Sequence, residues 1–535
     1  AARAVRRRSR PAAPMTVAVS VPERFNAAAF FLDRHLAEGR GDRIAFRYRG
    51  RNVTNAEVTT RASRAAGALR ARGVDIEQRV LLALPDCPQF AEAFWGAIRL
   101  GAVPVPLDPG LRAADYAFFV EDSRARAVVT HPAIAADFLA APCRGGRRPP
   151  VLVVGAPPSD AESYEDALAA AAPVGEPADT SRDDVALWGY TSGSTGRPKA
   201  AVHLQRDLVC AAELVGRGIF GIGPDDLILS ASKLFFAFGL GNSLYFPALA
   251  GAASVLIPER LDAEDLLAMV AAERPTHLFA VATVYARLLQ VPDAARRFEL
   301  GSLRICVSSG ESLPAGVYQG WRDRFGLELL DVVGSTEALH DYLANRPGAS
   351  RAGASGQVIP GFQARLVDGE GRPVLPGATG ELWIKGESTA TGYWNRHAES
   401  RRTMQGEWLR TGDMYYQDTD GYFYFQGRGD DMLKVGGVWV SPVEVEACLA
   451  EHPAVREAGV IGRRDADGLV RAHAFCVLRE GVAGDAALAA ALTEPVRRRL
   501  AGYKAPRWLD FVDELPKTST GKLQRFRLRA AASAP

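Results

Sequence analysis

Cysteine and histidine are scarce in this sequence, and long apolar runs are missing. The 535 residues include 6 cysteines without a CxxC pair and 8 histidines without an HExxH or HxH spacing. This scatter argues against a disulfide framework or a protein-built zinc site, and it favours a reducing, cytoplasmic location. No segment approaches the ~20 uninterrupted apolar residues that cross a bilayer, so we expect a soluble protein without a membrane partner.

A strong charge imbalance is also lacking. Lys and Arg total 64 and Asp and Glu total 62, which gives a net charge of +2 with both signs mixed along the chain. This balance argues against a nucleic-acid partner and favours small molecules. Residues 1–14 are rich in Arg, Ala and Pro. They could imitate a transit peptide, but we interpret them as an unstructured extension before a start at Met15.

The length and the hydrophobic pattern predict more than one domain. A chain of 535 residues exceeds what one hydrophobic core usually supports. Helical patterns alternate with short apolar runs over residues 53–129 and again over 227–333, which indicates βαβ units and parallel sheets. After Gly353 short strands and turn residues indicate a small β-barrel-like subdomain, and mixed α/β patterns return over 431–530.

The predicted fold class is therefore α/β, with a large N-terminal domain and a smaller C-terminal one. The large domain would combine two βαβ-type parallel-sheet subdomains with the β-rich subdomain, and the C-terminal α+β domain would be mobile. The predicted boundaries are 1–14 for the extension, 15–429 for the large domain (15–189 and 190–352 α/β, 353–429 β-rich) and 430–535 for the mobile domain.

The most informative segment is YTSGSTGRPK at residues 190–199, which follows the apolar run VALWG. Hydroxyl side chains alternate with glycines, whose N–H groups can approach anionic oxygens closely, and the final lysine adds a cation. The spacing is not GxxxxGK[ST], so this is not the common P-loop, and a plain Ser/Gly linker is the weaker alternative. The residues expected to bind phosphates are Thr191, Ser192, Gly193, Ser194, Thr195, Gly196 and Lys199.

This loop resembles the signature of the adenylate-forming superfamily, which comprises acyl-CoA synthetases, adenylation domains and luciferases. The similarity extends over nearly the whole chain, and GSTE at 334–337 looks like the second nucleotide motif of the family. The resemblance implies that Thr336 holds the α-phosphate and Glu337 ligates Mg²⁺, beside Gly334 and Ser335. One carboxylate suffices because Mg²⁺ also takes substrate phosphates, although a lone GSTE could simply cap a helix.

Further motifs complete the implied nucleotide site. SSGES at 308–312 resembles the adenine-binding turn, and TGD at 411–413 resembles the ribose-binding motif. The adenine contacts implied are Gly310, Glu311, Asp331 and Val332. The ribose contacts implied are Asp413 and Arg428, and Asp430 would be the hinge between the domains.

Near the C-terminus, LPKTSTGKLQR at 515–525 carries Lys522, which matches the catalytic lysine of the family. A positioned cation suits the reaction because an anionic acid attacks an anionic phosphate, although a solvated lysine on a Gly turn is the plain alternative. Lys522 lies 323 residues beyond Lys199 (522 − 199), so movement of the small domain would deliver it. After rotation, the same domain would open a pantetheine tunnel lined by Lys434, Gly436, Gly437 and Trp439.

The segments KLFFAFGLGN, GSTEALH and NRPG resemble benzoate and hydroxybenzoate CoA ligases. The implied aryl-acid pocket consists of Phe236, Ala237, Phe238, Gly239, Val333, Ala338 and His340, although such residues often only pack a core. Ala237 offers no counter-charge for an amino acid. Phe238, Val333 and Ala338 stand where tyrosine, isoleucine and methionine are usual, so we hypothesise a ring substituent, such as the amino group of 2-aminobenzoate or a hydroxyl.

The resemblance thus predicts an ATP-dependent aryl-CoA ligase, an AMP-forming acid–thiol ligase that uses ATP, Mg²⁺ and CoA as a monomer or homodimer. One alternative keeps the chemistry but loads the aryl group onto an acyl carrier protein. The other is a non-catalytic nucleotide-binding protein of the same fold. Both lysines, the metal-binding glutamate and the ribose aspartate are present, which argues against the second alternative.

Overall fold

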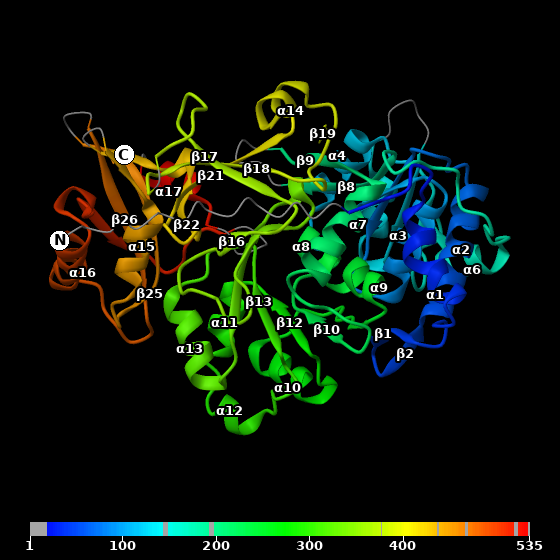
Figure 1. The fold of residues 1–535 in the computed structure, drawn as a ribbon, viewed down its shortest axis with the longest axis horizontal. Helices are drawn as coiled ribbons and strands as arrows, with labels where there is room; N and C mark the ends of the chain where they lie inside the picture. The colour runs from blue at the N-terminus through cyan, green and yellow to red at the C-terminus, as the bar shows by residue number, and fades with distance from the viewer. Residues whose placement is uncertain are drawn as a thin grey trace, which may run out of the picture.

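The computed structural model shows a large N-terminal part and a smaller C-terminal part (Figure 1). It describes residues 19–142, 148–191, 197–375, 377–435, 438–465, 469–517 and 523–532. In Figure 1 the C-terminal elements, coloured orange to red, gather at one end, and the N-terminal helices, coloured blue, lie at the other end. Among the described helices, none combines the length and apolar character required to cross a membrane.

The first sheet of the large part has five parallel strands, in the order β4-β3-β5-β6-β7. Its strands are β3 (Arg79–Ala83), β4 (Val103–Pro106), β5 (Ala127–Thr130), β6 (Val151–Val153) and β7 (Glu162–Ser163). The accompanying helices are α2 (Asn55–Ala71), α3 (Pro88–Arg99), α4 (Ala113–Ser123), α5 (Pro132–Ala140) and α6 (Tyr164–Ala170). Helix α2 begins at a capping box, in which Thr54 and Glu57 bond each other's backbone N–H groups.

The second sheet of the large part has nine strands, in the order β16-β15-β14-β13-β12-β10-β11-β1-β2. Its strands are β1 (Ile44–Tyr48), β2 (Arg51–Thr54), β10 (Leu227–Ser230), β11 (Ala253–Val255), β12 (His277–Ala280), β13 (Ile305–Ser308), β14 (Leu329–Gly334), β15 (Asp341–Ala344) and β16 (Gln357–Val358). The middle strands are parallel, whereas β2, β15 and β16 add antiparallel edges. Because β1 pairs with β11, the first predicted subdomain contributes strands to the sheet of the second.

Helices cover this second sheet and connect its strands. They are α10 (Ala263–Glu273), α11 (Ala282–Leu288), α12 (Ala294–Arg297) and α13 (Ala315–Phe325), with α1 (Arg34–Ala37), α7 (Gln205–Ala211), α8 (Ala237–Leu240) and α9 (Phe246–Ala250) elsewhere in the large part. Trp321 of α13 and Tyr285 of α11 are fully buried and meet edge to face at 4.8 Å. Aromatic burial of this kind contributes strongly to the core between helices and sheet.

Two antiparallel sheets follow in the large part. The first contains β8 (Val185–Thr191), β9 (Lys199–Leu204) and β19 (Gly392–Tyr393). The second contains β17 (Gln363–Val367), β18 (Gly380–Lys385), β20 (Met404–Gln405), β21 (Trp408–Gln417) and β22 (Phe423–Arg428). Helix α14 (His397–Thr403) lies between β19 and β20. The short strands predicted after Gly353 are therefore present, within an antiparallel sheet.

The C-terminal part has its own sheets and its own core. Its elements are β23 (Leu433–Val435), β24 (Val438–Val440), α15 (Pro442–Ala450), β25 (Val455–Arg464), β26 (Val470–Leu478), α16 (Ala486–Arg499), β27 (Trp508–Phe511) and α17 (Arg525–Ala532). Buried residues of this part, including Val445, Val460 and Cys476, form a separate hydrophobic cluster. The predicted α/β class, with parallel sheets in a large domain and a smaller C-terminal domain, is confirmed. The residue boundaries of the domains stay predictions.

Candidate active site

The phosphate-loop segment joins two paired strands. Strands β8 and β9 are antiparallel, and Thr191 at the end of β8 pairs with Lys199 at the start of β9. Residues 192–196, which carry the predicted contacts Ser192, Gly193, Ser194, Thr195 and Gly196, lie outside the described residues. The structure therefore fixes the two ends of the loop. At one of them, the Lys199 ammonium lies 4.5 Å from the centre of the Tyr393 ring.

Glu337 and Thr336 lie in a short 3₁₀ turn, Thr336–Ala338, which follows β14. The backbone of this turn is held at three carbonyls. His203 Nε2 bonds the Thr336 carbonyl at 2.7 Å, the Ala390 N–H donates to the Glu337 carbonyl at 2.7 Å, and a serine hydroxyl donates to the Ala338 carbonyl. These bonds tie the turn to β9 and to the chain that precedes β19, so the Glu337 side chain starts from a fixed backbone.

Gly189 of β8 leaves the room that Thr336 occupies. A Cβ atom added at Gly189 would lie 2.6 Å from Cγ2 of Thr336, well inside van der Waals contact. The strand before the phosphate loop and the turn that carries Glu337 therefore pack directly against each other. The preceding motif residues are equally confined, because a Cβ at Gly334 would lie 2.3 Å from the His340 carbonyl and the Ser335 N–H donates to that carbonyl at 3.3 Å.

Tyr393 connects the two nucleotide motifs, although it lies outside every motif that the sequence analysis identifies as a nucleotide contact. Its hydroxyl donates to Glu337 Oε1 at 2.7 Å, while its ring lies beneath Lys199. The side chain is 7% exposed. Burial and the neighbouring Glu337 raise its pKa, so the phenol stays protonated and remains a donor. Thus Lys199 and Glu337, 138 residues apart (337 − 199), share one aromatic contact.

The predicted ribose contacts lie on neighbouring strands. Asp413 of β21 pairs in register with Arg428 at the end of β22, and their side chains form an ion pair of 2.7 Å. Asp413 raises the pKa of Arg428. Gly412 takes φ +74°, and an added Cβ there would lie 3.0 Å from the Arg428 guanidinium. The TGD turn therefore needs glycine both for its backbone conformation and for the close approach of the arginine.

The predicted adenine residues lie at the ends of β13 and β14. Asp331 of β14 is buried, and its Oδ1 has no hydrogen-bond partner among the described residues. Burial, reinforced by nearby Asp341, raises its pKa well above the ordinary value. Val332 beside it is buried and pairs with β15. Gly310 takes φ +88°, and the Glu311 carboxylate accepts a bond from the Thr283 N–H.

The unpartnered Oδ1 of Asp331 indicates whether the residues present suit a bound nucleotide. A buried polar atom without a partner is costly, so such an atom is expected to meet a ligand or a water molecule. The exocyclic amine of adenine would donate to it.

Among the described residues no cluster of three or more His, Cys, Asp or Glu side chains could hold a metal ion. Glu337 alone, together with nucleotide phosphates, matches the ligand set of Mg²⁺.

Four of the predicted aryl-acid residues, 236–239, lie at the start of α8, and the other three lie within residues 333–340. Phe236 precedes the helix as its N-cap residue, and the Phe238 ring lies 6.0 Å from Phe279 and 5.5 Å from the His340 ring. Phe236, Ala237, Phe238 and Val333 are half-buried, whereas Gly239, Ala338 and His340 are buried. A Cβ at Gly239 would lie 2.2 Å from the Lys233 carbonyl, so this position requires glycine.

A buried ion pair holds the segment that carries these residues, and no motif in the sequence indicates it. Asp86 accepts a bond from the Leu234 N–H at 2.9 Å, and its other oxygen lies 3.9 Å from the Lys233 ammonium. Lys233 also donates to the carbonyls of Ile257 and Glu259. Burial raises the pKa of Asp86 to about 6, although Lys233 and the Leu234 N–H oppose the rise.

The predicted residues of the C-terminal part are described only in part. Lys434 of β23 is exposed. Asp430 lies in a 3₁₀ turn, Gly429–Asp431, and its carbonyl accepts a bond from Arg529 of α17. Trp439 belongs to β24. Outside the described residues lie Gly436, Gly437, Lys522 and the side chain of Trp439.

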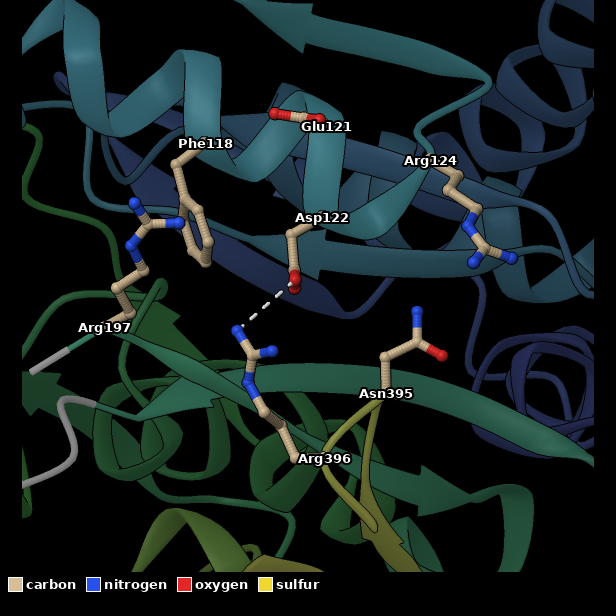
Figure 2. Close-up of a pocket in the computed structure, with 7 residues that line it drawn as sticks. All are labelled: Phe118, Glu121, Asp122, Arg124, Arg197, Asn395 and Arg396. Atoms are coloured by element: carbon tan, nitrogen blue, oxygen red, sulfur yellow. Dashed lines mark ion pairs between the residues drawn. The ribbon is translucent and has the colours of Figure 1, made fainter. Parts of the chain in front are cut away.

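A surface hollow of about 260 Å³, here called the α4 hollow, lies beside the phosphate-loop hairpin (Figure 2). It is lined by Phe118, Glu121, Asp122, Arg124, Arg197, Asn395 and Arg396. Figure 2 shows Asp122 and Arg396 pointing toward each other across it. Asp122 also accepts a bond of 2.8 Å from the Tyr190 hydroxyl, directly before the phosphate loop. The hollow contains none of the predicted aryl-acid residues.

Two family profiles match the chain. The profile of the AMP-binding enzyme matches residues 33–394, and that of the AMP-binding enzyme C-terminal domain matches residues 444–522. The chain belongs to the AMP-binding enzyme family. The predicted superfamily is thereby confirmed, and the two matches lie in the large and small parts of the structure.

Relatives within the AMP-binding enzyme family match nearly the whole chain. Benzoate–CoA ligase of Thauera aromatica is 42% identical over 518 residues, which cover 96% of this chain and 97% of that protein. The structure of the anthranilate CoA ligase AuaEII with anthranoyl-AMP superposes with a TM-score of 0.89 at 38% identity, covering 96% and 98% of the two chains. A benzoate CoA ligase from Burkholderia xenovorans LB400 gives 0.87 at 41% identity, covering 94% and 100%.

Proposed function

We propose that this chain is an AMP-forming acid–thiol ligase that joins a small aromatic carboxylic acid to CoA with ATP. The observation that carries the proposal is the shared contact of Lys199 and Glu337 with Tyr393. It gathers a cation suited to phosphate and a carboxylate suited to a metal ion at the end of the phosphate-loop hairpin. The benzoate and anthranilate CoA ligases among the relatives support an aromatic acid as the substrate class.

In the first half-reaction, a carboxylate oxygen of the acid attacks the α-phosphorus of ATP, and pyrophosphate leaves. Two anions meet in this step, so positioned cations lower the barrier, typically by ~10²–10³ in rate for one such contact. We assign these roles to Lys199 at the loop and to Lys522. Magnesium bound at Glu337 would supply further neutralisation of phosphate charge. Asp413 and Arg428 would hold the ribose.

In the second half-reaction, the CoA sulfur attacks the acyl carbon of the aryl-adenylate, and AMP leaves. We propose that the C-terminal domain rotates about Asp430 between the two steps and removes Lys522 from the site. The hairpin around Gly436 and Gly437 would then line the path of the pantetheine arm, where a side chain would obstruct it.

The aryl acid would bind against Phe236, Phe238 and Val333. None of these side chains carries charge, and Ala237 offers none, so a flat apolar ring fits better than an amino acid. The smaller side chains at positions 238, 333 and 338 support an acid with a ring substituent, such as 2-aminobenzoate or a hydroxybenzoate. Values of kcat/KM for benzoate and its 2-, 3- and 4-amino and hydroxy forms test this, and an optimum at unsubstituted benzoate would refute it.

The central experiment is pyrophosphate–ATP exchange with purified protein, run over a panel of aromatic acids. Acid-dependent exchange is expected, because adenylate formation is reversible before the thiol enters. Absence of exchange with every acid would refute the ligase function. Steady-state thioester formation with free CoA, compared with transfer to a carrier protein bearing phosphopantetheine, then identifies the acceptor, and we expect free CoA.

A further inference from the structure

One tyrosine contacts both nucleotide motifs, and the way its strand is held bears on the chemistry. Tyr393 lies in β19, where it pairs in register with Ala201 of β9. Ala201, the partner of Tyr393, lies two positions after Lys199 on β9. The Tyr393 backbone N–H also donates to the hydroxyl of Ser400 in α14 at 2.8 Å, so the residue is held from both sides.

The residues that follow Tyr393 anchor the same segment to helix α4 and strand β8. The Trp394 indole N–H donates to the Asp122 carbonyl at 2.9 Å, and the Trp394 ring lies 4.7 Å from that of Trp188 in β8. Arg396 reaches the Asp122 carboxylate at 3.7 Å across the α4 hollow (Figure 2). Tyr393 therefore belongs to a segment that is anchored at Asp122 and Trp188 as well as at the turn carrying Glu337.

We propose that Tyr393 is a positioning residue, whose hydroxyl orients the Glu337 carboxylate for the metal ion and whose ring holds Lys199 beside it. The proposal rests on the proposed function for the identity of the reaction. The hydroxyl bonds Oε1 of Glu337 at 2.7 Å, which fixes the rotation of the carboxyl group. The Ala390 N–H fixes the backbone of the same residue. The glutamate is thus held at both ends, and no hydrogen bond from the described part of the chain occupies its second oxygen, which is left for a cation.

The contact of the Tyr393 ring with Lys199 has a separate effect, because it orders the lysine side chain. Lys199 lies 4.5 Å from the ring centre, within the distance at which an ammonium is attracted to an aromatic face. A lysine has four rotatable bonds and loses entropy when it is ordered, so this contact reduces the ordering that phosphate binding would otherwise require. The hydroxyl and the ring can therefore be separated by substitution. Tyr393→Phe removes only the first contact, and Tyr393→Leu removes both.

The test measures ATP binding by calorimetry as a function of free Mg²⁺, without any acid and therefore without turnover. Tyr393→Phe should raise the Mg²⁺ concentration for half-maximal ATP binding by about 10-fold, the usual effect of losing a hydrogen bond to a charged group. In the Glu337→Gln background the same change should have no further effect, because the carboxylate it orients is absent. At saturating Mg²⁺, Tyr393→Leu should weaken ATP binding more than Tyr393→Phe.

Several outcomes would overturn the proposal. An equal effect of Tyr393→Phe in the wild-type and Glu337→Gln backgrounds would show that the two residues act independently. A lower Tm with an unchanged Mg²⁺ dependence would show a purely structural role. If wild-type protein binds ATP with Mg²⁺ but shows no acid-dependent exchange, the proposed ligase function fails, while the binding cycle still decides the role of Tyr393.

Discussion

Replacing Asp86 by asparagine should change the stability of the protein in a pH-dependent way. Asp86 is 3% exposed, and its carboxylate accepts a hydrogen bond from the Leu234 N–H, at the start of the segment that carries Phe236 and Phe238. An asparagine keeps an oxygen that can accept this bond. Lys233 keeps its two backbone carbonyl partners. The substitution therefore removes mainly the buried negative charge.

The size of the effect follows from the pKa. Burial raises the pKa of Asp86 from its ordinary value of 3.8 to about 6. Between these values the native protein binds a proton that the unfolded chain has lost, so stability falls as the pH rises through this range. At about 1.4 kcal/mol per pKa unit, the cost of the ionised group above pH 6 is about 3 kcal/mol. Below the ordinary value this cost disappears.

The assay is thermal unfolding of the wild type and Asp86→Asn at several pH values between about 4 and 8, spanning the two pKa values. The variant should gain stability relative to the wild type as the pH rises, by up to about 3 kcal/mol near pH 8. Asp160→Asn, a substitution of an exposed carboxylate, is the control and should show a flat difference. A flat difference for Asp86→Asn as well would refute the reasoning.

Three further substitutions test other parts of the structure. Lys522→Ala should lower acid-dependent exchange by at least ~10²-fold while sparing thioester formation from preformed aryl-adenylate, and equal loss in both rates would indicate a structural lysine. Gly189→Ala should displace Thr336 and lower the exchange rate with little change in Tm; an unchanged rate would contradict the packing described. Arg525→Ala should leave the half-buried Glu446 carboxylate without its cation, because the two contacts of 2.7 Å from the guanidinium are lost. Thermal unfolding should show a loss of about 3 kcal/mol in the C-terminal domain, and a much smaller loss would mean that water replaces the arginine.

The candidate nucleotide motifs could be proposed from the sequence because their chemistry is local. Glycines and hydroxyls in YTSGSTGRPK must be near one another in the chain to form one loop, so spacing alone is informative. Buried strands such as β12 and β13 were also predictable, since strands covered on both faces are continuous apolar runs. The fold class followed from the alternation of such runs with helical patterns.

Contacts between distant segments could not be predicted in the same way. Tyr393 meets Glu337 across 56 residues because of the pairing of β19 with β9, and a two-residue strand has no detectable periodicity. Asp86 meets Leu234 across 148 residues, and an isolated aspartate in a sequence looks like a surface residue. Such partners depend on the register of strands and the packing of layers, which single-sequence patterns do not encode.

The nine-stranded sheet constrains how the chain can be built and divided. Strands β1 and β2 complete their pairing only with β11, so the ribosome must deliver some two hundred further residues before the sheet edge closes. Until then this hairpin is an open edge that a chaperone or a second nascent chain could occupy. A fragment that ends after the first parallel sheet would leave this hairpin without its partner strand β11. The large domain should therefore be expressed and engineered as one piece.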